Sequence, residues 1–169
     1  MVTIRIETTC DYSAIRKINE LAFGRPNEAN LVDALRQNAD PFISLVAELS
    51  GQVVGHIVFS PVTIENDNSV FTALGLAPLA VLPEFQNRGI GSTLVRAGLE
   101  KCQQLEHDIV VVLGHPNFYP RFGFIPSQEK GIRCEYDVPD DVFMIAELNP
   151  ETLRGRKGLV KYHPEFSKV

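Results

Sequence analysis

Residues 86–91 read QNRGIG, and they stand where an apolar stretch gives way to a stretch with helical spacing. Two glycines there permit a tight turn, and they also let an anion come close to the backbone. The first turn of a helix leaves N–H groups without partners, and the helix dipole makes that end positive. We therefore expect the amides of residues 88–92 to hold a phosphate or pyrophosphate; the alternative is a glycine-rich helix start with no ligand.

The common nucleotide-binding motifs do not fit this stretch. A P-loop needs GxxxxGK followed by Ser or Thr, and no lysine stands at the required place. The dinucleotide fingerprint GxGxxG needs a third glycine where the chain has Leu94, and it needs a shorter connection than LPEFQNR. The sequence therefore disfavours an ATP-binding or NAD-binding protein.

The apolar stretch LAPLAV just before the motif contains Pro78. Proline has no N–H to give to a sheet ladder and is rare in central strands. We expect the sheet to open at Pro78, which would leave backbone groups of Leu79 and Val81 free to bind a ligand. A bulge or an edge strand is the alternative.

The elements that position these residues follow from hydrophobic periodicity. Alternating or β-branched runs predict strands at residues 3–7, 42–49, 53–62, 70–81, 107–114, 143–148 and 158–163. Apolar residues at steps of three and four predict helices at residues 10–23, 27–39 and 89–107. Residues 116–124 read as a compact turn or short helix, and 128–141 as a surface loop. This order predicts a mixed α/β (α+β) protein around one sheet, with a single domain over residues 1–169.

Three further residues within these elements have expected roles. A structural role is expected for Asp11 and Cys102, and two alternatives stay open for His56. Asp11 stands near the start of a predicted helix, where it is available as a cap. His56 alternates with apolar residues, so it either points into a cleft or is satisfied within the sheet. Cys102 falls on the apolar face of its helix and reads as a small core residue.

Composition narrows the function classes. With 44% hydrophobic and 22% charged residues, the chain has an ordinary globular composition, and no apolar run approaches a membrane span. The net charge of −5, without a basic cluster, argues against nucleic acid. Three cysteines with no CxxC pair predict reduced thiols in a cytoplasmic protein and neither a disulfide framework nor a metal site.

The chain is similar to the GNAT superfamily of acyl-CoA-dependent N-acetyltransferases. The central motif of that family, a strand and proline turn before (Q/R)xxGxG, stands here as LAVLPEFQNRGIGSTLV, and its Y-x-x-x-G-F block stands as residues 119–124. With the tail FMIAELNPETLRGRKGLVKYHPEF, the chain resembles the YhbS-like branch over nearly its whole length.

The resemblance implies a fold and a ligand. The sheet would be mixed and mostly antiparallel, splayed between its fourth and fifth strands, with helices on both faces. The pantetheine arm of acetyl-CoA or CoA would lie in the gap, and the pyrophosphate would lie on the amides of residues 88–92. The implied cofactor-binding residues are Leu79, Ala80, Val81, Gln86, Asn87, Arg88, Gly89, Ile90, Gly91, Ser92 and Asn117.

The resemblance also implies the reaction, transfer of an acetyl group to a primary amine by direct attack in a ternary complex. Tyr119 would lie near the thioester sulfur and act as general acid for the leaving thiolate; packing among the nearby phenylalanines, with its hydroxyl bonded to backbone, is the alternative. His115 is the candidate base, because its ordinary pKa of about 6.5 suits proton removal. The family carries an acidic residue more often there, so a route without a base stays open.

The sequence indicates which segments would contact the acceptor and does not identify the acceptor itself. In this family the segment between the first two helices and the late strands select the substrate, which points here to Phe23, Arg25 and Glu28 and to the loop CEYDVPDD. We expect a small-molecule or peptide amine and a monomer or homodimer, with no nucleic acid and no membrane. Two alternatives remain: a non-catalytic module that binds or senses acetyl-CoA, and a transferase of another acyl group.

Overall fold

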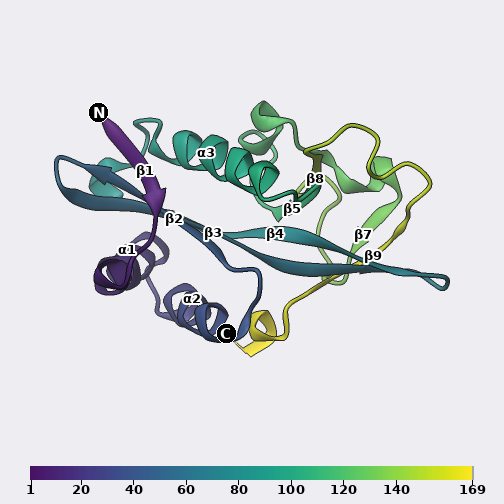
Figure 1. The fold of residues 1–169 in the computed structure, drawn as a ribbon, viewed down its shortest axis with the longest axis horizontal. Helices are drawn as coiled ribbons and strands as arrows, with labels where there is room; N and C mark the ends of the chain where they lie inside the picture. The colour runs from purple at the N-terminus through teal and green to yellow at the C-terminus, as the bar shows by residue number, and fades with distance from the viewer. Residues whose placement is uncertain (169) are drawn as a thin grey trace.

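The structure, a computed structural model, describes residues 1–168, which form one nine-stranded sheet covered by helices (Figure 1). The strands are β1 Val2–Ile6, β2 Ile43–Leu49, β3 Gln52–Glu65, β4 Val70–Val81, β5 Ile109–Leu113, β6 Ile125–Pro126, β7 Ile132–Cys134, β8 Phe143–Glu147 and β9 Gly158–Tyr162. The α-helices are α1 Tyr12–Phe23, α2 Asn27–Asn38 and α3 Ile90–Gln104. Short 3-10 turns include η3 Tyr119–Phe122, η4 Ser127–Lys130 and η5 Pro164–Lys168.

The sheet is mixed, as predicted. Its main order is β1-β2-β3-β4-β5-β8-β6, and β9 pairs with the far half of β3. Neighbouring strands along the main order are antiparallel except β4 and β5, which are parallel. Helices α1 and α2 lie on one face and α3 on the other (Figure 1). The predicted layers, helices on both faces of a mostly antiparallel sheet, are therefore confirmed.

Helix α3 lies close to the sheet because it turns apolar side chains and a glycine toward the strands. Leu94, Val95 and Cys102 are fully buried beneath it. A Cβ added at Gly98 would lie 2.4 Å from the ring of Phe59 on β3, so only glycine lets helix and strand approach this closely. The prediction that Cys102 is a core residue is confirmed.

Strands β4 and β5 separate soon after they meet. They pair only at Leu74–Val110 and Gly75–Val111, while β4 continues to Val81. On its other side β4 carries an irregularity: Phe59 of β3 faces Leu76, but Ile57 faces Leu79. One extra residue on β4 therefore lies at Ala77–Pro78, and both of the alternatives considered for Pro78, a bulge and an opening of the sheet, occur together.

Several predicted boundaries were wrong, and a strand was missed. Strand β3 ends at Glu65 instead of residue 62. Helix α3 begins at Ile90 and ends at Gln104 instead of covering 89–107, because Gly89 has a φ of +85° and lies outside the helical region as its N-cap. The stretch 128–141 is not only a surface loop. Within it, β7 pairs in parallel with β9, and Ile132 is completely buried. The strand was missed because Ile132 is a single apolar residue among charged neighbours.

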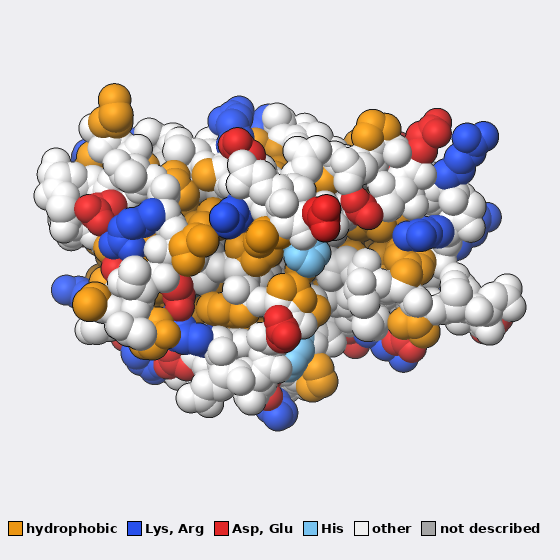
Figure 2. Space-filling view, in the orientation of Figure 1, with side chains coloured by type: hydrophobic (Ala, Val, Ile, Leu, Met, Phe, Trp, Pro, Cys, Tyr) orange, Lys and Arg blue, Asp and Glu red, His pale blue; other side chains and the backbone are white. Residues whose placement is uncertain are grey.

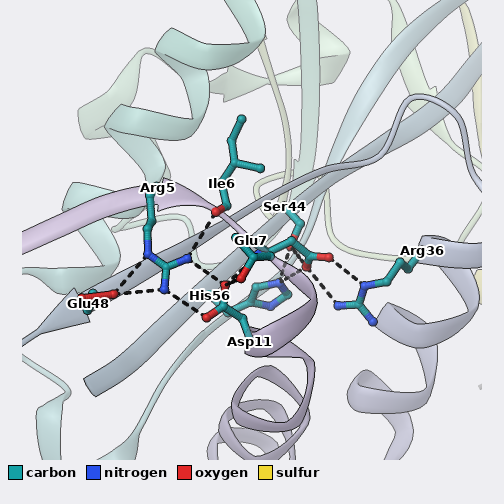
Figure 3. Close-up of polar contacts among 9 residues, drawn as sticks. Arg5, Ile6, Glu7, Asp11, Arg36, Ser44, Glu48 and His56 are labelled. Carbon is teal, nitrogen blue, oxygen red and sulfur yellow. Dashed lines mark hydrogen bonds and ion pairs between the residues drawn. The ribbon is translucent and has the colours of Figure 1, made fainter. Parts of the chain in front are cut away.

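A buried polar network fastens α1 and α2 to the sheet (Figure 3). Arg36 of α2 donates two hydrogen bonds to the Glu7 carboxylate, at 2.7 and 2.9 Å. Ser44 Oγ donates to the same carboxylate at 2.5 Å and lies 2.7 Å from His56 Nε2. Since the Ser44 proton is used on Glu7, His56 Nε2–H donates to Ser44, and because His56 Nδ1 faces the NH2 donor of Asn19, the ring accepts there and is neutral.

Both ring nitrogens of His56 thus have hydrogen-bond partners within the protein, and the side chain does not point into a cleft. Its Nδ1 lies 3.2 Å from Asn19 Nδ2 of α1, which also donates to the Ile15 carbonyl. The imidazole is fully buried, and burial, reinforced by the charge of Arg36, lowers its pKa from 6.5 to about 3.

Asp11 is not a side-chain cap for α1, contrary to expectation. Its carboxylate accepts hydrogen bonds from the Arg5 guanidinium at 2.7 and 3.0 Å and from the Thr8 N–H at 2.7 Å. Arg5 also binds Glu48 on β2 (Figure 3). The hydrogen bond from Arg5 lowers the pKa of Asp11 to about 2.

The neutral state of His56 predicts a dependence of stability on pH. Its folded pKa lies below the unfolded value of 6.5, so the unfolded chain binds the extra proton and stability falls as pH drops through 6.5 toward 3. Between pH 7 and pH 5 this group should remove about 2 kcal/mol from the free energy of unfolding. Urea unfolding at the two pH values measures the change.

The matched variants are His56→Gln, which removes the titrating group, and His107→Gln, which removes a histidine outside the network. The pH-dependent loss should shrink by about 2 kcal/mol in the first and persist in the second. An equal loss in wild-type protein and His56→Gln would contradict a buried neutral His56.

Candidate functional site

The stretch 86–92 forms a turn that presents backbone amides at the start of α3. Asn87 and Gly89 have φ of 64° and 85°, and Gly89 is the N-cap without a side-chain cap hydrogen bond. The first helical bond runs from the Thr93 N–H to the Gly89 carbonyl. The N–H groups of residues 90–92 precede that bond and have no partner within the helix, which suits an anion at the positive end of the dipole.

A cavity of about 490 Å³ lies against this turn. Its lining residues are Val81, Phe85, Gln86, Asn87, Gly89, Ile90, Gly91, Ser92, Phe118 and Arg121. Most of the predicted pyrophosphate residues therefore surround one cavity. Arg88 lies outside this lining, with its guanidinium 5.5 Å from the Phe85 ring centre.

Arg121 is a cationic residue of this cavity that the motif analysis missed. Its guanidinium lies 5.2 Å from the centre of the Phe118 ring, and Nη2 donates to the Asn117 carbonyl at 3.4 Å. Stacking on an aromatic ring holds the charge over the cavity while leaving further N–H donors for a phosphate. Its position inside the FYPRFGF block was the available signal.

The separated part of β4 directs backbone groups into the gap. Leu82 N–H donates to Val54 on β3 at 2.9 Å, so by strand alternation Ala80 also bonds to β3, while Leu79 and Val81 face the other way. The Val81 carbonyl accepts a hydrogen bond from Gln86 Nε2 at 2.9 Å. Leu79 and Val81 thus face the gap as predicted, whereas Ala80, whose side chain is buried, borders neither this cavity nor the one described next.

Tyr119 stands on the β5 side of the gap. The residue is buried, and its ring packs edge to face against Phe118 at 4.9 Å and Phe124 at 5.7 Å. Its hydroxyl forms no hydrogen bond with any residue in the described part of the chain, unlike the packing alternative, in which it bonds to backbone. Burial raises the pKa of Tyr119 to about 12, so the phenol keeps its proton at neutral pH.

His115 and Asn117 follow β5 and are both exposed. The His115 Nδ1 accepts a hydrogen bond from the Asn117 N–H at 3.1 Å. In the neutral ring the proton is then on Nε2, and the imidazole has no free acceptor nitrogen in this conformation. Asn117 lines neither this cavity nor its neighbour and reaches the first one only through Arg121.

A second cavity, of about 550 Å³, adjoins the first at Phe118, which lines both. Its other lining residues are Phe23, Arg25, Glu28, Leu31, Leu76, Ala77, Pro78, Leu79, Leu113, Gly114, His115, Tyr119, Tyr136, Tyr162 and Phe166. It therefore includes both sides of the β4–β5 gap, the α1–α2 connection and the C-terminal elements.

The three predicted acceptor residues all line this second cavity. Arg25 donates to the Glu28 carboxylate at 2.9 and 2.5 Å, so the two charges form a pair. The hydrogen bond from Arg25 lowers the pKa of Glu28. Phe23 is 40% exposed at the edge. Two further lining residues, Tyr162 and Phe166, were not predicted, because only folding brings η5 against α2 and Tyr162 of β9 to this cavity.

Two findings on the described residues complete the site. No cluster of three or more His, Cys, Asp or Glu side chains with the spacing of a metal site occurs within residues 1–168. No helix in that part of the chain has the length and apolar character needed to cross a membrane. The turn before α3 lines the first cavity, Tyr119 lines the second, and the two cavities adjoin at Phe118.

The chain matches a known family and close relatives. The family profile described as "Acetyltransferase (GNAT) domain" matches residues 3–126. The chain is 38% identical over 161 residues to YjhQ of Escherichia coli strain K12, covering 90% of this chain and 89% of that protein. It is 34% identical over 166 residues to YhbS of the same strain, covering 98% of both. Both relatives are named uncharacterized N-acetyltransferases.

Two solved structures share the fold over nearly all of this chain. YhbS from Escherichia coli in complex with CoA gives a TM-score of 0.90 at 34% identity and covers 98% of this chain and 92% of that one. A GNAT family acetyltransferase from Brucella melitensis in complex with acetyl-CoA gives a TM-score of 0.80 at 35% identity, covering 98% of both chains.

The position of Tyr119 depends on Gly114, which predicts the effect of a substitution. A Cβ at residue 114 would lie 2.3 Å from the Tyr119 ring, so Gly114→Ala must displace that ring. We expect the free energy of unfolding to fall by about 1–3 kcal/mol, measured by urea denaturation. Gly91→Ala is the control, because its Cβ would meet its nearest neighbour at 3.8 Å and alanine favours the helix. Equal stability of the two variants would contradict the described packing.

Proposed function

Because the chain belongs to the GNAT acetyltransferase family, we propose that it transfers an acetyl group from acetyl-CoA to a primary amine by direct attack in a ternary complex. The observation that carries this proposal is a pair of adjoining cavities. Residues 90–92 and Val81 line the first, Leu79 and Tyr119 line the second, and Phe118 lines both. Each part matches one part of an acyl-CoA: pyrophosphate, pantetheine arm and thioester.

The pyrophosphate is proposed to lie on the amides of residues 90–92. Arg121 then lies on the Phe118 side of the phosphates, and Gln86 lies at the entrance. The CoA and acetyl-CoA complexes of the two solved relatives support this ligand, because each was crystallised with a molecule that carries a pyrophosphate.

The pantetheine arm is proposed to replace the missing strand beside β4. Its amides would bond to the backbone of Leu79 and to the N–H of Val81, since the Val81 carbonyl already accepts from Gln86. The Leu79 N–H, which stays free when the pantetheine bonds to the Leu79 carbonyl, is proposed to stabilise the oxyanion of the tetrahedral intermediate, because Leu79 lines the same cavity as Tyr119. Opening the sheet thus provides both binding and transition-state donors.

Tyr119 is proposed as the general acid for the leaving thiolate. Its raised pKa of about 12 means that the phenol is protonated when the sulfur leaves, so it can donate a hydrogen bond and then the proton. The same apolar surroundings disfavour a bare thiolate, which helps the transfer toward sulfur.

The attacking amine is proposed to enter without a dedicated base. His115 accepts the Asn117 N–H at Nδ1, so it can take a proton only after releasing that hydrogen bond. Transfer of an ammonium group into an apolar cavity lowers its pKa and favours the free amine that the reaction needs. The nitrogen loses its extra proton as the thiolate leaves, and the Tyr119 phenolate takes up that proton, which restores the phenol.

A pair of variants in the α3 first turn tests acetyl-CoA binding. Ser92 lines the first cavity, and Ser92→Glu would place a carboxylate against the phosphates, whereas Ser92→Gln has nearly the same shape without charge. Calorimetric titration should show a Kd raised about 100-fold by the glutamate and less than about 10-fold by the glutamine. Equal affinities of the two variants, or no binding by folded wild-type protein, would refute the phosphate site.

Tyr119→Phe tests the general acid. We expect kcat to fall by about 10²-fold or more while the KM for acetyl-CoA is unchanged, because the hydroxyl acts when the thiolate leaves. The rate of CoA release is the measurement, and Tyr12→Phe, outside both cavities, is the control. Full turnover by Tyr119→Phe would remove the assignment, and tight acetyl-CoA binding without release of CoA to any amine would identify a sensing module instead.

A further inference from the structure

The second cavity has two parts with different neighbours. One part lies between β4 and β5, where Leu79, Gly114 and Tyr119 leave space for the pantetheine arm. The other part lies between the α1–α2 connection and the C-terminal elements. An acceptor amine must reach the thioester from this second part, so its lining residues decide which amines enter.

An aromatic wall forms one side of the acceptor part. Tyr136, from the loop after β7, and Tyr162 of β9 have ring centres 5.6 Å apart, and Tyr162 and Phe166 of η5 are 5.0 Å apart. The three rings therefore form one continuous surface. Leu31 of α2 and Phe23 of α1 also line this part of the cavity.

The charges of the acceptor part cancel. Among the described lining residues, Arg25 and Glu28 are the charged pair, and they bind each other. A polycation finds no unpaired carboxylate in this set, and a carboxylate finds no unpaired guanidinium or ammonium. Either would lose hydration without a compensating partner.

The rim of the cavity is apolar as well. Phe23, Leu113 and Tyr136 line it and are 40%, 44% and 40% exposed. In the middle of the view in Figure 2, hydrophobic side chains lie at the surface beside a histidine side chain, with acidic side chains next to them. Large apolar side chains left at the mouth of a cavity favour an apolar occupant.

We propose that the acceptor is a small primary amine carried on an apolar, preferably aromatic, body that bears no carboxylate and no second positive charge. The inference rests on the proposed acetyl transfer and adds the substrate class. The apolar body packs against Tyr136, Tyr162 and Phe166, and the amine points toward Tyr119. A cavity of about 550 Å³, shared with the pantetheine arm, suits a small molecule.

The test compares four amines at saturating acetyl-CoA by the rate of CoA release. 2-Phenylethylamine has the proposed body, ethanolamine has the same amine on a small polar body, spermidine is a polycation, and lysine carries a carboxylate. We expect kcat/KM for 2-phenylethylamine to exceed each of the others by at least about 10-fold, as burial of an aromatic ring predicts. A higher value for any of the other three would overturn the proposal.

A variant tests whether the aromatic wall causes the preference for 2-phenylethylamine. Tyr136 is partly exposed, so Tyr136→Ala should fold, and it should lower kcat/KM for 2-phenylethylamine at least about 10-fold with an unchanged Kd for acetyl-CoA. Leu105→Ala removes another exposed apolar side chain, outside the cavity, and should change neither value. No effect of Tyr136→Ala would overturn the assignment of the wall.

Calorimetric titration of 2-phenylethylamine into the CoA-saturated protein separates this inference from the proposed reaction. Binding that Tyr136→Ala abolishes, without turnover of any amine, would refute acetyl transfer and support the cavity assignment. Neither binding nor turnover of 2-phenylethylamine, in a protein that acetylates another amine, would refute the substrate class and leave acetyl transfer standing.

Discussion

The structure depends on one constraint: β4 must leave β5 immediately after Gly75. Up to that point the two strands are paired in parallel, and beyond it the backbone of Leu79 and Val81 faces a gap. Backbone N–H and C=O groups that leave a sheet ladder need another partner, and at a cavity that partner is a ligand or water. The bulge at Ala77–Pro78 and the hydrogen bond from Gln86 to the Val81 carbonyl are the local means by which the chain holds this opening.

The surrounding elements give the gap two ends. Gly98 lets α3 lie directly on Phe59, which brings the amides of the α3 first turn to one end of the gap. The network of Arg36, Glu7 and His56 holds α1 and α2 on the opposite face, where their connection forms the other end (Figure 3). The site is therefore assembled from elements that are each fixed by burial away from it.

Local patterns predicted the elements, and the glycine motif predicted the turn with free amides at the start of α3, where we propose that the pyrophosphate binds. Periodicity located α1, α2, α3 and the main strands, and Pro78 marked the opening, because these signals lie within a few residues of one another. What depends on distant packing was missed. The single apolar Ile132 gave no strand signal among charged neighbours, and nothing in the sequence placed Tyr162 and Phe166 in the second cavity. The stacked position of Arg121 also became visible only in three dimensions.

The central claim is that the opened backbone of β4 binds acetyl-CoA. NMR-detected amide hydrogen exchange, with and without acetyl-CoA, tests it most directly. Acetyl-CoA should slow exchange of the Leu79 or Val81 amide at least about 10-fold, because a free N–H becomes hydrogen-bonded. The Ala80 amide, which by alternation bonds to β3, should change little and is an internal control. If acetyl-CoA binds but slows exchange of neither the Leu79 nor the Val81 amide, the opened strand is not the binding site of the ligand.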